Sequence, residues 1–71
     1  MTTFAVLVEK AGKGFSAYSP DVPGCVATGR TRALAIQRMR RALASHLEML
    51  RDSGEPLPRA TTTAVNISVA A

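Results

Sequence analysis

The sequence predicts an α+β fold in which one helix packs on an antiparallel-leaning sheet, in the element order β-β-β-α-β. Two apolar runs of strand length flank a Gly-containing turn near the N-terminus. A long run with apolar positions at helical spacing begins at residue 32, and an alternating apolar segment follows it near the C-terminus. With 71 residues, the chain has room for one domain, which we assign to residues 1–71.

The first strand is expected over residues 3–10. Phe4, Val6 and Val8 share one face because side chains alternate along a strand. The residues between them are also largely apolar, so we expect this strand to be central in the sheet and partly covered on both faces. The tetrapeptide Ala-Gly-Lys-Gly at 11–14 predicts a tight hairpin that leads into a second strand.

The second strand is expected over residues 15–19, antiparallel to the first. The loop at 20–24 follows, and it contains two prolines and a glycine. Pro23 pre-sets its own backbone angle and Gly24 tolerates a positive φ, a combination that favours a type II turn. A short third strand is expected over residues 25–28.

The helix is expected over residues 32–53. Gly29 ends the preceding strand, and the hydroxyl of Thr31 can accept a free backbone N–H as the N-cap. Gly54 occupies the position of a glycine that ends a helix, and Pro56 prevents it from restarting. The predicted apolar stripe consists of Ile36, Met39, Leu43, Leu47 and Leu50.

A proline-containing connector at 57–61 leads to the last predicted strand, at 62–69. Val65, Ile67 and Val69 alternate with polar or small residues in this segment. This alternation predicts a strand whose three apolar side chains point into the core.

Self-association is expected, because so short a chain buries only about 60% of its surface and needs a staple, a metal or a partner. Cys25 is the only cysteine, so no internal disulfide can form, and one Cys with one His is too few ligands for zinc. One helix covers one face of the sheet, so Leu7 and Tyr18 are expected on the open face or beside a free edge. We predict a homodimer or homotetramer with no metal and no cofactor.

The compartment is expected to be the cytoplasm. The N-terminal apolar run follows no basic segment and is too short for a signal sequence. No run approaches the roughly 20 apolar residues that span a bilayer. A single cysteine also fits a reducing compartment.

The residues for catalysis are few, and the sequence predicts that the protein is not an enzyme. Among the carboxylates only Glu48 and Asp52 share a helical face, near the helix end, where such pairs are usually solvated. His46 has no Asp, Ser or Cys near it in the sequence, so packing is a better interpretation than general base. Cys25 enters a strand and is expected to behave as a small packed hydrophobe.

The net charge is +4, and five positive charges fall within twelve residues that contain no acid: Arg30, Arg32, Arg38, Arg40 and Arg41. One interpretation is a solvated helix face. The other is an electrostatic contact with nucleic acid or an acidic protein, made by Arg30, Arg32, Arg38 and Arg41. Arg32 lies in the first helical turn, where the helix dipole disfavours cations and a bound anion would offset the cost.

A family resemblance rests on motifs in a fixed order along nearly the whole chain. An opening Phe-x-Val-x-Val strand is followed by Phe-Ser-Ala-Tyr-Ser-Pro-Asp-Val-Pro-Gly-Cys at 15–25, Gly29-x-Thr31, a long helix, Gly-Glu-Pro-Leu-Pro at 54–58 and an alternating strand. This order resembles the HicB-like antitoxin family. The residues that define the fold motif are Pro20, Asp21, Pro23, Gly24, Gly29 and Thr31.

The resemblance implies a β-β-β-α-β domain, described for the family as a partly degraded ribonuclease H-like fold. It also implies a partner, the small HicA toxin, which cleaves messenger RNA and which HicB proteins bind and silence. Many relatives carry a C-terminal DNA-binding domain. We expect this chain to lack one, since its sequence stops after the last predicted strand.

Two other departures from the family pattern bear on the partner. Acidic residues usually follow the Thr, whereas Arg32-Ala-Leu follows it here. The toxins are typically basic, so a +4 protein would repel one unless the contact is apolar. Two functions therefore remain open: an antitoxin, or a solitary HicB-like nucleic-acid-binding or regulatory module that uses a basic helix face. Residual nuclease activity is a third, which the lack of clustered acidic metal ligands disfavours.

Overall fold

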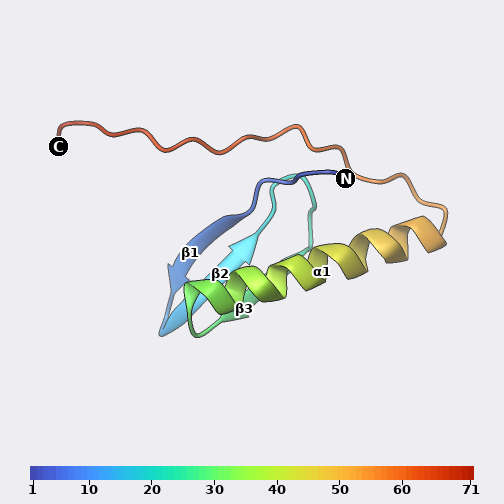
Figure 1. The fold of residues 1–71 in the computed structure, drawn as a ribbon, viewed down its shortest axis with the longest axis horizontal. Helices are drawn as coiled ribbons and strands as arrows, with labels where there is room; N and C mark the ends of the chain where they lie inside the picture. The colour runs from blue at the N-terminus through green and yellow to red at the C-terminus, as the bar shows by residue number, and fades with distance from the viewer.

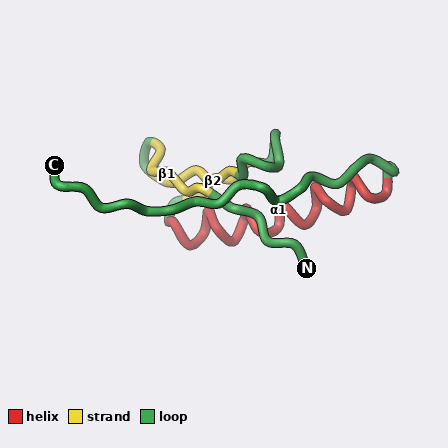
Figure 2. The backbone as a smooth tube through the Cα atoms, turned by 90° about the horizontal axis from the view of Figure 1, so that it is seen from above, coloured by secondary structure: helices red, strands yellow, loops and turns green.

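The computed structural model describes residues 1–71, with four regular elements: β1 (Leu7–Ala11), β2 (Gly14–Tyr18), β3 (Val26–Gly29) and α1 (Arg32–Asp52). The strands form one antiparallel sheet in the order β1-β2-β3, and α1 packs along one face of it (Figure 1). Figure 2 shows the sheet and the helix as two layers. The α+β class and the first four elements are confirmed, and no helix is both long enough and apolar enough to cross a membrane.

The strand β1 is shorter than expected and lies at the edge of the sheet. Its pairing with β2 begins at Leu7, whereas the sequence predicted a strand from residue 3. Ahead of it, the Ser19 hydroxyl donates a 2.8 Å hydrogen bond to the Ala5 carbonyl. The prediction of a central position was wrong, because no fourth strand pairs with the other side of β1.

Both turns form at the positions that their residues predict. Ala11 pairs with Gly14 across a two-residue loop, and Gly12 has a φ of 57° there. In the second loop the Cys25 amide donates to the Val22 carbonyl at 3.2 Å, and Gly24 has a φ of 83°. That hydrogen bond and the positive φ are the features of a type II turn, as Pro23-Gly24 predicts.

Both ends of α1 are capped as predicted. The Thr31 hydroxyl accepts a 3.1 Å hydrogen bond from the Leu34 amide, and Thr31 itself has an extended backbone. At the other end, Gly54 has a φ of 72° and its amide donates to the Arg51 carbonyl at 3.1 Å. A glycine with positive φ just after the last turn satisfies carbonyls that the helix leaves free.

The core between sheet and helix is small, and it is formed by Ala17, Val22, Cys25, Ala35 and Met39. Of the predicted apolar stripe only Met39 is buried; Ile36, Leu43, Leu47 and Leu50 are half-buried. The second buried helical residue is Ala35, one position before Ile36. The stripe is therefore only partly covered: Ile36 and Leu43 line a groove on the β1 side, and the second half of α1 extends past the strands (Figure 1).

The last predicted strand does not pair. Residues 62–69 belong to no helix or strand, so the element order of this chain is β-β-β-α rather than β-β-β-α-β. Val65, Ile67 and Val69 were expected to point inward, but they are 75%, 78% and 77% exposed. The alternation shows that the segment can form a strand, and it carries no information about which edge receives it. We call residues 63–69 the C-terminal arm.

Candidate functional site

The first candidate surface is a basic hollow at the hairpin end of the sheet. Arg30, Arg38 and Lys13 surround it, and its volume is about 360 Å³. The Arg38 guanidinium donates a 3.0 Å hydrogen bond from Nη1 to the Thr28 carbonyl, which holds it over β3. The structure thus brings a cation of the β1–β2 turn beside two of the predicted contact arginines.

The other two predicted contact arginines lie elsewhere. Arg32 lies with Arg40 on the β1 side of α1, where both line an apolar groove. Arg41 is exposed and lies one turn after Arg38, away from the β1 side. The arginines therefore do not form one continuous surface, and their predicted role in binding stays a prediction.

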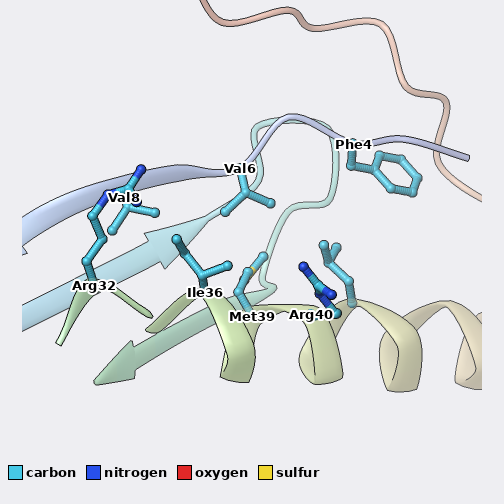
Figure 3. Close-up of a pocket in the computed structure, with 8 residues that line it drawn as sticks. Phe4, Val6, Val8, Arg32, Ile36, Met39 and Arg40 are labelled. Atoms are coloured by element: carbon cyan, nitrogen blue, oxygen red, sulfur yellow. The ribbon is translucent and has the colours of Figure 1, made fainter. Parts of the chain in front are cut away.

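The second candidate surface is the apolar groove between the N-terminal segment and α1. Phe4, Val6 and Val8 form one wall, and Ile36, Met39 and Leu43 form the other. In Figure 3, Val6 and Val8 point toward Ile36 and Met39 across a space whose volume is about 310 Å³. The predicted shared face of Phe4, Val6 and Val8 is confirmed, but it is only half-buried.

The third candidate surface is the sheet face that α1 leaves open. Leu7 pairs with Tyr18, and Tyr18 pairs with Val26, so the three side chains form a row across the sheet. Val26 is 57% exposed, and Leu7 and Tyr18 are half-buried. A side-chain hydrogen bond to Glu9 and the charge of that carboxylate raise the pKa of Tyr18 above its ordinary value.

Cys25 and His46, which are 21 positions apart in the chain, line one shallow hollow of about 280 Å³. Cys25 is buried, and desolvation raises the pKa of its thiol. Cys25 belongs to the core cluster, where it packs as a small hydrophobe. No three of the His, Cys, Asp and Glu side chains gather where they could hold a metal ion.

Asp21 fixes the root of the C-terminal arm, which sequence reasoning missed. Its Oδ2 accepts 2.8 Å hydrogen bonds from the amides of Thr61 and Thr62. Its Oδ1 accepts from their hydroxyls, at 3.2 Å and 2.7 Å respectively. These four hydrogen bonds hold the pKa of Asp21 below its ordinary value. The bond from the Thr62 hydroxyl has the largest effect, the bond from the Thr62 amide comes next, and the two bonds from Thr61 contribute less. The only sequence signal was a lone acid in the loop and three threonines in a row.

Replacing Asp21 by asparagine is expected to release this root, because an amide group offers one acceptor oxygen where the carboxylate offers two. Amide hydrogen exchange at Thr61 and Thr62 should accelerate at least tenfold, while Asp52→Asn, on the exposed end of α1, should leave both rates unchanged.

The same contact has a defined pH dependence. A carboxyl with a depressed folded-state pKa contributes stability above its unfolded pKa of about 3.9 and loses it as the pH falls through the folded value. The amide signals of Thr61 and Thr62 should therefore move with a midpoint below about 3.9. A midpoint at or above that value would contradict the carboxylate contact.

The remaining motif residues have structural positions. Pro20 is exposed at the start of the loop that carries Asp21. Gly29 is buried at the end of β3, where an added Cβ would lie 2.7 Å from the Ala35 amide nitrogen. The motif residues thus shape the β2–β3 loop, allow β3 and α1 to approach closely, and fix the root of the C-terminal arm.

Comparison with known proteins identifies the family. Residues 4–70 match the family model described as the HicB-like antitoxin of bacterial toxin–antitoxin systems. The chain is also 32% identical over 56 residues to an uncharacterised 14.9 kDa protein from the rep–hol intergenic region of Haemophilus phage HP1. That match covers 79% of this chain and 42% of the phage protein, so it spans less than half the length of this relative. No solved structure matches significantly. Since the family match covers nearly every residue described above, the chain belongs to the HicB-like antitoxin family.

Proposed function

We propose that this protein is an antitoxin that binds and silences a small HicA-type toxin that cleaves messenger RNA. The observation that carries the proposal is the family match over residues 4–70. In this proposal the protein is a cytoplasmic, non-enzymatic homodimer or homotetramer whose single domain occupies residues 1–71. It acts by covering the toxin rather than by chemistry of its own.

The open sheet face is the surface that best suits such a partner. The protein carries +4 and the toxins of the family are typically basic, so long-range electrostatics opposes the encounter. An apolar contact avoids this cost, and the row of Leu7, Tyr18 and Val26 is the part of the open face that offers one. Glu9, on the same face beside Tyr18, adds one negative charge.

Co-expression with a small basic reading frame adjacent to its gene tests the proposal. Growth should be arrested by the toxin alone and restored by the wild-type protein. Val26→Asp places a charge in the apolar row and should reduce rescue and weaken the complex at least tenfold. Gln37→Asp, at an exposed site on α1, should rescue like wild type. No rescue by the wild-type protein would overturn the function, whereas equal rescue by both variants would overturn only the contact face.

A nucleic-acid-binding module is the second candidate, and the basic hollow favours it. Lys13, Arg30 and Arg38 come from three different segments yet surround one depression. Phosphate binding by such a group should weaken steeply with salt, since each neutralised phosphate releases counterions. The affinity of an apolar contact with a toxin should not fall with salt in this way. Gel-shift titrations with short RNA and DNA at two salt concentrations separate the two candidates.

A further inference from the structure

The C-terminal arm has the properties of a strand and lacks a partner within its own chain. Its seven residues, Thr-Ala-Val-Asn-Ile-Ser-Val, contain no charge, no proline and no glycine. Val65, Ile67 and Val69 project at period two and are each at least 75% exposed. Figure 1 shows the arm running clear of the sheet and the helix. A segment of this composition tends to pair with other strands when it is left free.

The root of the arm is fixed in place. Both oxygens of Asp21 bind the backbone and the hydroxyls of Thr61 and Thr62, immediately before the arm begins. The arm therefore leaves the body from a defined point on the β2–β3 loop rather than from a freely moving linker.

The same chain also carries a free sheet edge. β1 pairs only with β2, and none of the backbone hydrogen bonds outside the helix and the strand ladders involves β1. Every second residue of β1 therefore directs its N–H and C=O away from the sheet. Natural proteins cover, shorten or charge such an edge, because it accepts any suitable strand.

The apolar groove lies directly behind this edge. A strand added beside β1 would place alternate side chains over the space between Val6 and Val8 on one side and Ile36 and Leu43 on the other. Those helical residues are half-buried because the sheet ends at β1. The alternate valines and isoleucine of the arm have the spacing and the apolar character that this position requires.

The arm does not reach this position in its own chain. Residues 60–64 pass close to residues 3–6, where together they line a shallow depression. Beyond that point Val65, Ile67 and Val69 are exposed, and β1 itself remains without a second neighbour. The C-terminal arm and the free edge of β1 are thus both present in one molecule, and neither pairs with a further strand within it.

We propose that the C-terminal arm of each copy pairs with β1 of a second copy and lays Val65, Ile67 and Val69 over its apolar groove. Two copies related by a two-fold axis satisfy both arms and both edges at once, so the exchange is closed and leaves no arm free to recruit further copies. It needs no toxin, because both surfaces belong to this chain. The exchange completes the four-stranded sheet that the sequence predicts.

Two variants of adjacent arm residues test the exchange by light scattering at micromolar concentration. The wild-type protein should have the mass of a dimer or an even multiple of it. Ile67→Asp places a charge on the face that meets the groove and should give a monomer. Asn66→Asp places the same charge on the opposite face and should keep the wild-type mass. Neither side chain packs in the body, so both variants should keep the helical circular dichroism of the wild type.

Cross-linking between two differently tagged chains identifies the edge. In a Cys25→Ala background, one chain carries Asn66→Cys in the arm and the other carries Glu9→Cys in β1, both on the sheet face away from α1. A short thiol cross-linker should join the two chains after they are mixed and equilibrated. A chain with both substitutions that cross-links only to itself would show that the arm folds back in its own copy. That result, a monomeric wild-type protein, or a dimer that survives Ile67→Asp would each overturn the proposal.

Discussion

Replacing Gly29 by alanine is expected to destabilise the domain by about 3 kcal/mol, the upper end of the range for overpacking. Gly29 is buried where β3 passes beneath the first turn of α1. An added Cβ would lie 2.7 Å from the Ala35 amide nitrogen and 3.0 Å from the Leu34 carbonyl carbon. These are backbone atoms, which cannot rotate away as a flexible side chain could. The methyl group can fit only if the strand and the helix move apart.

The effect should appear in urea unfolding followed by circular dichroism, as a lower midpoint with an unchanged slope. Thr28→Ala is the matched control, because residue 28 is the adjacent position of β3 and its side chain is exposed. Its carbonyl, which accepts from Arg38, is retained. We expect a change within about 0.5 kcal/mol for this control. Equal stability of the Gly29→Ala variant and the wild type would show that strand and helix do not approach so closely.

The features that sequence reasoning predicted are those that depend on near neighbours. The turn at Pro23-Gly24, the Thr31 cap and the Gly54 helix end each follow from backbone angles or hydrogen bonds within a few residues. The structure confirms all three. A local rule suffices in these cases because the residue that causes the feature and the backbone group that responds to it are at most four positions apart.

The features that it missed depend on residues far apart in the chain. Asp21 and Thr61 are 40 positions apart, and their contact follows from the fold rather than from either residue's neighbours. Ala35 is buried against Gly29 at the end of β3, whereas Ile36 stays half-buried on the β1 side, where its burial depends on the number of strands beneath the helix. That number depends in turn on where the segment at 62–69 pairs. Period-two alternation specifies two faces of a strand but says nothing about which edge, or which copy, receives it.

The basic surface shows the same difference between features that depend on near neighbours and features that depend on the fold. A run of arginines is visible in the sequence, but α1 directs Arg32 to the β1 side and Arg41 away from it. Lys13 joins Arg30 and Arg38 only because the β1–β2 turn folds back beside the end of β3. Charge clustering along the chain therefore overestimated the continuity of the basic surface, and it missed one of its members.

Replacing Met39 by alanine is expected to cost about 2–5 kcal/mol, the range for truncating a large buried side chain. Met39 is 1% exposed and, with Val22, is one of the two largest fully buried side chains. A domain of this length has a total stability of about 4–11 kcal/mol, so the variant should be substantially unfolded at moderate temperature. Thermal unfolding by circular dichroism measures the change. Met49→Ala is the control, since Met49 is 53% exposed on the same helix and should change stability by less than about 0.5 kcal/mol.

The Met39 result also bears on the exchange of arms, because Met39 lines the apolar groove as well as the core. If the arm of a second copy covers that groove, native structure and self-association are linked, and the unfolding midpoint must rise with protein concentration. Ile67→Asp should abolish this dependence, because it removes the second copy while leaving Met39 in place. In the monomer, Met39→Ala should still be strongly destabilising, since its contacts with the core belong to one chain. If the unfolding midpoint of the wild type does not depend on protein concentration, no second copy covers the groove, and Met39 acts only as a core residue.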